Sequence, residues 1–142
     1  YEVLRSLVGS EMCIRDSLST DPKAVLVDVR TQIEWTLIGK PDLSQIPGEP
    51  VYLQWVTAQG PNPNFINELQ AALEARKVPK DAPVFFLCQS GGRSKIAAIQ
   101  CAGLGYTASY NIAEGLEGAL DERKHRNSTS GWKVAGLPWT QA

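Results

Sequence analysis

The chain lacks the features that mark several large classes of protein. Its 142 residues include three cysteines and one histidine, and no two cysteines have the close spacing of a zinc or dithiol site. Lys and Arg number 14 and Asp and Glu number 15, so a net charge of -1 offers no basic surface for nucleic acid. Every apolar run is short, which excludes a membrane span. The length suits one compact domain with its own core.

The amino-terminal segment, residues 1–17, has no recognisable folded pattern. It begins with Tyr1 rather than Met, and the stretch SLVGSEMCIRDS has neither a clear helical period nor the layout of a signal peptide. It looks like a translated sequencing-adapter remnant, so we give Cys13 no function. We expect the native chain to begin near Leu18 or Ser19, and one domain to fill residues 18–142. Without a disulfide framework, a reduced, cytoplasmic setting is expected.

Short strand-like runs alternate with helical patterns along the rest of the chain. The runs that predict strands are residues 23–29, 51–56, 83–88 and 107–112. The patterns that predict helices are residues 31–39, 65–78 and 93–104. Residues 113–142 predict one short helical piece followed by loops. This order favours an α/β fold with a central, mostly parallel sheet flanked by helices, in a single domain.

Local signals fix several of these boundaries. Thr31 and Glu34 have the spacing of a capping box at the start of the first helix. Pro79 is expected to stop the second helix, and Gly105 suits the carboxyl-terminal cap of the third. The helical spacing in residues 65–78 predicts an inward face made of Phe65, Leu69, Ala72, Leu73 and Arg76.

The stretch PVFFLCQSGGRSKIAAIQ places a thiol, Cys88, between a strand and a helix. Ligands of parallel sheets bind beyond the carboxyl ends of the strands, where Cys88 is expected. Gly91 and Gly92 can adopt positive φ, and successive loop amides can form an anion-binding nest. The following helix directs its positive dipole end to the same place. A negative charge on sulfur, or on a group bound to sulfur, would be stabilised there.

Several motifs in one order carry a family resemblance. LVDVRTQIEW, then VFFLCQSGGRS, then YNIAEGLEG and GWKVAGLPW together resemble the rhodanese-like domain, specifically the bacterial single-domain sulfurtransferases. The resemblance covers residues 18–139. It implies that Cys88 accepts a sulfane sulfur as a persulfide and passes it to cyanide or a thiol. It implies a persulfide-binding loop made of Gln89, Ser90, Gly91, Gly92, Arg93 and Ser94.

The resemblance also implies what the protein works with. The expected partners are a small-molecule sulfur donor such as thiosulfate and a thiol or cyanide acceptor, with a protein acceptor as a further option. No metal, cofactor, nucleic acid or membrane is implied. The family has another strand and helix before residues 23–29, a region that residues 1–17 largely replace here. We therefore expect one edge of the sheet to be missing or poorly formed.

Two other functions stay open. Four residues separate Cys88 from Arg93, which makes a six-residue loop of the sulfurtransferase kind; related phosphatases are similar but have a loop one residue longer. This length favours sulfur transfer over a cysteine-based phosphatase or an enzyme like arsenate reductase. A non-turnover sulfur carrier or binding module is the second alternative. Binding modules of this fold usually lack the cysteine, which this chain keeps.

The remaining candidates have mainly structural interpretations. Asp28 and Arg30 end the first strand and support the site: a structural ion pair is expected for Asp28, whereas Arg30 could face the opening and attract an anionic donor. Arg93 either binds the donor or braces the loop. Cys101 is expected in the core, with a resolving thiol as the lesser alternative. His125 lies in a charged, solvated run, and Trp55 either packs or lines the sulfur pocket.

Overall fold

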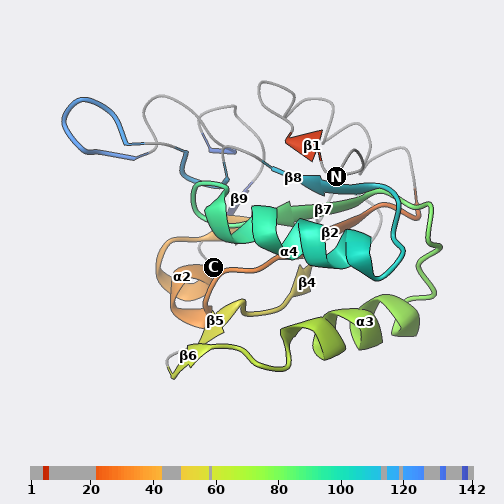
Figure 1. Cartoon of the computed structure of the whole chain (residues 1–142). Helices are drawn as coiled ribbons and strands as arrows, with labels where there is room; N and C mark the ends of the chain where they lie inside the picture. The colour runs from red at the N-terminus through yellow and green to blue at the C-terminus, as the bar shows by residue number, and fades with distance from the viewer. Residues whose placement is uncertain are drawn as a thin grey trace.

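A five-stranded parallel sheet forms the centre of the protein (Figure 1). The computed structural model describes residues 5–6, 22–42, 49–57, 59–112, 115–118, 120–126, 132–133 and 139–140. The strands lie in the order β1-β8-β7-β2-β4, and every neighbouring pair is parallel. Their bounds are β1, Arg5–Ser6; β2, Val25–Asp28; β4, Val51–Tyr52; β7, Val84–Leu87; and β8, Ser109–Asn111.

The two central strands explain why the sheet is parallel and covered on both faces. All four residues of β2 and all four of β7 are buried. Val25, Val27, Val84 and Phe86 enter one hydrophobic cluster, whereas Leu26, Phe85 and Leu87 enter the other. Because strand side chains alternate between faces, continuous apolar runs of this kind need cover on both sides.

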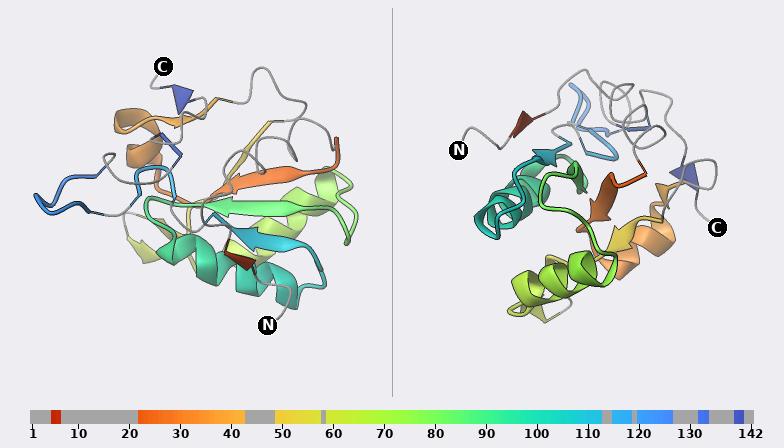
Figure 2. Two further views of the ribbon diagram at one scale, coloured as in Figure 1. Left: turned by 90° about the horizontal axis from the view of Figure 1, so that it is seen from above. Right: turned by 90° about the vertical axis from the view of Figure 1, so that its right-hand side faces the viewer.

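Helices α3 (Phe65–Ala75) and α4 (Gly92–Gly103) cover one face of the sheet (Figures 1 and 2). Their buried residues recur at helical spacing: Phe65, Leu69 and Leu73 on α3, and Ser94, Ala97, Ala98 and Cys101 on α4. On the other face, Leu116, Ile112 and Trp132 complete the second cluster. That face is therefore covered by chain segments that follow β8. The predicted α/β fold with a mostly parallel sheet is confirmed.

Short elements gather at the carboxyl end of the sheet. Helix α2 (Gln32–Leu37) begins with the predicted capping box between Thr31 and Glu34. Beyond it, β3 (Lys40–Pro41) pairs with β9 (Trp139–Thr140) in antiparallel fashion.

Within the described segments, no helix has both the length and the apolar character needed to cross a bilayer.

Several sequence-based boundaries are wrong in detail. Residues 51–56 are not one strand: β4 pairs with β2, whereas β5 (Val56–Thr57) forms an antiparallel pair with β6 (Gly60–Pro61). Helix α3 ends at Ala75, so Arg76 caps it and is exposed rather than facing the core. Among the described residues after β8 there are turns but no helix. The edge beside β8 is not missing but carries only the two residues of β1, and its expected poor formation stays a prediction.

Truncation of Leu69 should destabilise the fold strongly, because its side chain is fully buried between α3 and the sheet. We expect Leu69→Ala to lower the free energy of unfolding by about 2–5 kcal/mol in urea denaturation. Ile66→Ala on the same helix is the matched control, since Ile66 is 40% exposed. Equal losses in the two variants would contradict this packing.

Candidate functional site

Cys88 directly follows β7 at the carboxyl edge of the sheet, and two polar groups lie against its sulfur. The backbone N–H of Gly91 donates to Sγ at 3.1 Å, and Ser94 Oγ lies 3.3 Å from Sγ. The cysteine is only 1% exposed. The predicted loop residues Gly91 and Ser94 are therefore in direct contact with the thiol, inside the protein.

Gly91 gives helix α4 an unusual start. It is the N-cap residue, with φ of 103°, a left-handed conformation that favours glycine. As glycine it supplies no side-chain oxygen to the first helical amides, and no side-chain cap is present. The N–H groups of Gly92, Arg93 and Ser94 are the ones that a helix leaves without an internal partner. They and the helix dipole therefore remain available to an anion held at Cys88.

Asn111, at the end of β8, fixes the orientation of the Ser94 hydroxyl. Ser94 Oγ donates to Asn111 Oδ1 at 2.6 Å, and Asn111 Nδ2 donates to the Gly91 carbonyl at 3.1 Å. A hydroxyl has one proton, so in this arrangement its oxygen accepts from the Cys88 thiol, and the proton can turn to the sulfur after ionisation. The sequence interpretation did not identify Asn111. Its only sequence signal is a polar residue in a buried strand.

The segment after β8 closes over the loop. The amide of Leu116 donates to the Cys88 carbonyl at 2.9 Å, and the amide of Glu117 donates to the Gln89 carbonyl at 3.0 Å. Gly115 makes this approach possible, since a Cβ there would lie 2.4 Å from the Gln89 oxygen. The side chains meet as well, because Gln89 Nε2 donates to Glu117 Oε2 at 2.6 Å. Glu117 itself is 7% exposed.

Arg93 is committed to an ion pair with helix α2. Its NH1 and NH2 groups lie 2.8 and 3.0 Å from the two carboxylate oxygens of Glu34. Burial acts to raise the pKa of Glu34, but the hydrogen bond and charge of Arg93 outweigh it and leave the pKa below its usual value. The hydrogen bond that Arg93 donates to Glu34 in turn raises the pKa of Arg93. Glu34 also closes the capping box of α2, so one carboxylate joins that helix to the Cys88 loop.

Asp28 and Arg30 form the structural ion pair expected of them. Arg30 Nε and NH2 donate to the Asp28 carboxylate at 3.0 and 2.8 Å, and NH2 also donates to the Gly39 carbonyl at 2.7 Å. Both residues are fully buried. The alternative that Arg30 faces the opening is therefore wrong: the carboxylate and carbonyl hold its guanidinium inside the protein.

The other predicted residues take less direct positions. Ser90 lies in the loop and Gly92 begins α4; both are exposed, whereas Gln89 is partly buried. Cys101 is fully buried in the core cluster, as expected, and burial raises the pKa of its thiol to about 11. His125 is exposed, as expected. Trp55 packs edge-on against Phe65, with ring centroids 4.9 Å apart.

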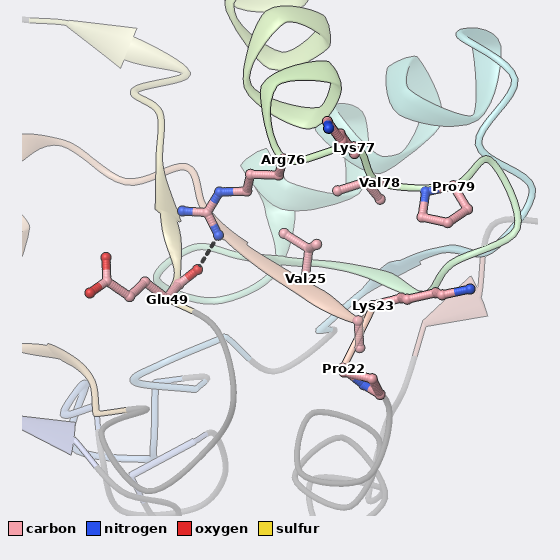
Figure 3. Close-up of a pocket in the computed structure, with 9 residues that line it drawn as sticks. Pro22, Lys23, Val25, Glu49, Arg76, Lys77, Val78 and Pro79 are labelled. Atoms are coloured by element: carbon pink, nitrogen blue, oxygen red, sulfur yellow. Dashed lines mark hydrogen bonds between the residues drawn. The ribbon is translucent and has the colours of Figure 1, made fainter.

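Two further observations concern ligands. Cys13 falls outside the described residues, and the described part of the chain contains no cluster of three or more metal-ligating side chains. A pocket of about 430 Å³ lies between the start of β2 and the end of α3, where Arg76 donates to the Glu49 carbonyl (Figure 3). Val25 in its wall pairs with Val84, the first residue of β7, so this pocket lies at the opposite edge of the sheet from Cys88.

Comparison with known proteins places the chain in a family. The model of the STR4 middle domain matches residues 9–142. The chain belongs to this family. Among its relatives, an uncharacterized protein of Rickettsia conorii is 36% identical over 124 residues, covering 87% of this chain and 89% of that protein. The chloroplastic rhodanese-like domain-containing protein 4 of Arabidopsis thaliana is 26% identical, covering 87% of this chain and 23% of that longer protein.

Two solved structures resemble the chain. The crystal structure of Rv0390 from M. tuberculosis has a TM-score of 0.81 and 41% sequence identity, and the match covers 98% of this chain and 97% of that one. The polysulfide-sulfur transferase of Wolinella succinogenes has a TM-score of 0.57 at 20% identity, covering 98% and 80% of the two chains. At that identity the likeness concerns the fold, which is rhodanese-like.

Ionisation of Cys101 should make the protein less stable at high pH. The pKa of this thiol is about 11 in the folded chain against 9.0 ordinarily, so between these values the folded chain keeps a proton that the unfolded chain releases. The free energy of unfolding should therefore fall as pH rises through this interval. Urea denaturation at pH 8, 9 and 10 would show a steeper fall for the parent than for Cys101→Ala. Parallel pH dependences would refute the assignment.

Proposed function

We propose that the chain is a sulfurtransferase that carries a sulfane sulfur on Cys88 as a persulfide. The observation that supports it most directly is the placement of Sγ against the Gly91 amide and the Ser94 hydroxyl, at an uncapped helix start. These donors suit a negative charge on sulfur in a buried setting. Membership in a family with a rhodanese-like relative agrees with this chemistry.

The reaction consists of two displacements at sulfur. In the first, the Cys88 thiolate attacks the outer sulfur of the donor, a new S–S bond forms, and the donor's own S–S bond breaks. The leaving group takes the bonding electron pair and departs as sulfite from thiosulfate, or as a thiolate from an organic persulfide. In the second, cyanide or a thiolate attacks the outer sulfur, and the electron pair of the enzyme's S–S bond returns to Sγ.

Each local group has a role in this scheme. Gly91 and the amides that begin α4 stabilise the thiolate and then the persulfide anion. Ser94 turns its hydroxyl hydrogen bond from Asn111 Oδ1 to the charged sulfur, and Asn111 keeps the hydroxyl within reach of that sulfur. Cys88 releases its proton to water before the attack, so the attacking group is an anion and no separate general base acts on the donor. Small-molecule donors and acceptors are the proposed partners, and no cofactor enters either step.

The ion pair of Arg93 favours sulfur transfer over phosphoryl transfer. A cysteine-based phosphatase needs its loop arginine to neutralise the oxygens of a bound phosphate. Here Glu34 already holds both terminal nitrogens of Arg93. Together with the six-residue loop, this pairing supports a site built for a single sulfur atom.

Replacement of the nucleophile tests the proposal. After incubation with excess thiosulfate or, separately, with a small alkyl persulfide, then desalting, the parent should gain one sulfur atom in its intact mass. The Cys88→Ser variant should gain no sulfur, whereas the Cys101→Ala variant should gain one sulfur atom, as the parent does. Dithiothreitol should remove the added mass. No gain with either donor in a folded parent would refute persulfide formation.

The Ser94 hydroxyl should assist formation of the persulfide. A hydrogen bond to a charged group is worth about 1.5–3 kcal/mol, so Ser94→Ala should load sulfur at least about tenfold more slowly. Ser109→Ala is the matched control, because Ser109 is another buried serine, whose hydroxyl donates instead to the Tyr106 carbonyl. Both loading rates would be measured by quenching the reaction at set times and determining the intact mass. Equal rates in the two variants would exclude the hydroxyl from the reaction.

A further inference from the structure

Among the described residues, two arginines near the loop pair with carboxylates. Arg93 forms its two-pronged ion pair with Glu34, and Arg30 is buried against Asp28, with its NH1 group also buried and so out of reach of a donor. The side chains of Arg93 and Glu34 remain 26% and 21% exposed, so this pair lies where solvent or a donor can meet it. A donor approaching the loop therefore meets a neutralised arginine rather than a free cation.

A second carboxylate is fixed on the other side of the loop. Glu117 accepts the Gln89 side-chain amide at 2.6 Å, and its own backbone amide binds the Gln89 carbonyl. One N–H of the Gln89 side-chain amide is thus held by a carboxylate. Glu34 and Glu117 contact the loop at Arg93 and Gln89, the residues that stand at either end of the stretch between Cys88 and Ser94.

The remaining stabilising groups act on one atom. The Gly91 amide and the Ser94 hydroxyl both address the sulfur of Cys88, and the helix dipole acts over a short range. They stabilise one negative charge on sulfur. Thiosulfate brings two negative charges, and its sulfonate would need a second cationic site next to this one. Nearby carboxylates instead oppose such a group, and like charges in close contact are costly.

We infer that the donor is an organic persulfide, R–S–SH, whose R group carries no anionic group close to the sulfur, rather than an inorganic dianion. This inference rests on the proposed function. The Cys88 thiolate attacks the outer sulfur, the donor S–S bond breaks, and R–S⁻ departs with the electron pair and is then protonated. The site then has to stabilise a single negative charge throughout the reaction. This matches the hydrogen-bond donors of the loop, which all act on one sulfur atom. Glu34 is a specificity-determining residue because it keeps Arg93 from the donor.

The first experiment uses two donors with the same reactive sulfur. The persulfide of N-acetylcysteine carries a carboxylate, whereas the persulfide of its methyl ester carries none. With the parent protein, the second-order rate constant for loading should be several-fold larger for the ester. The difference should shrink as salt is raised, because added ions screen the repulsion. Equal rate constants for the two donors at low salt would overturn the inference.

The second experiment frees Arg93. Glu34→Gln retains an oxygen for the capping box but removes the charge that neutralises the arginine. Loading by thiosulfate should become about tenfold faster, a change of about 1.4 kcal/mol, while loading by the methyl ester stays within about twofold. Glu74→Gln is the charge-matched control, since Glu74 is exposed near the carboxyl end of α3 and binds Gln70. It should change neither rate.

The outcomes separate the two proposals. If Glu34→Gln leaves thiosulfate loading unchanged or slower, the ion pair only braces the loop and the donor inference is wrong, while persulfide formation on the parent still supports sulfur transfer. If no donor loads the folded parent, sulfur transfer itself is refuted, and the donor inference with it. The ester and acid comparison needs no variant, so it decides the matter even if Glu34→Gln fails to fold.

Discussion

Two backbone hydrogen bonds hold the chain just after β7 against the chain just after β8. They join Leu116 to the Cys88 carbonyl and Glu117 to the Gln89 carbonyl. Such a close approach needs Gly115, because any Cβ would collide with the Gln89 backbone. The direction of the loop, and hence the position of the Cys88 sulfur at the start of α4, depends on this contact. The neighbouring strands β7 and β8 bring the two segments together.

The charged groups around the loop are organised as pairs. Asp28 and Arg30 are buried together, Glu34 holds Arg93, and Glu117 accepts from Gln89. Buried or half-buried charges require such partners, since an isolated one would lose its hydration without compensation. In the proposed reaction, a negative charge on sulfur is stabilised by backbone amides and one hydroxyl, because both arginines near the loop are held by carboxylates.

Sequence reasoning worked best where the signal was local. The strand that precedes Cys88, the glycine-rich turn, the capping box of α2 and the buried positions Phe65, Leu69 and Leu73 of α3 all follow from neighbouring residues. It was wrong where contacts between segments far apart in the sequence determine the strand limits or the direction of a side chain. Residues 51–56 divide between two sheets, and Arg30 turns inward to Asp28 and the Gly39 carbonyl. Both outcomes depend on which segments the fold places beside them.

The sequence by itself determined that a cysteine ends a buried strand, that glycine permits a sharp turn after it, and that a helix begins there. These features depend on backbone preferences and on apolar periodicity, which neighbouring residues carry. Only the tertiary structure decided that Asn111 orients Ser94, that Glu34 occupies Arg93 and that Glu117 occupies Gln89. The partners in each pair lie 17, 59 and 28 residues apart. Pairing at such separations is set by the packing of strands and helices, because no local preference links side chains so far apart along the chain.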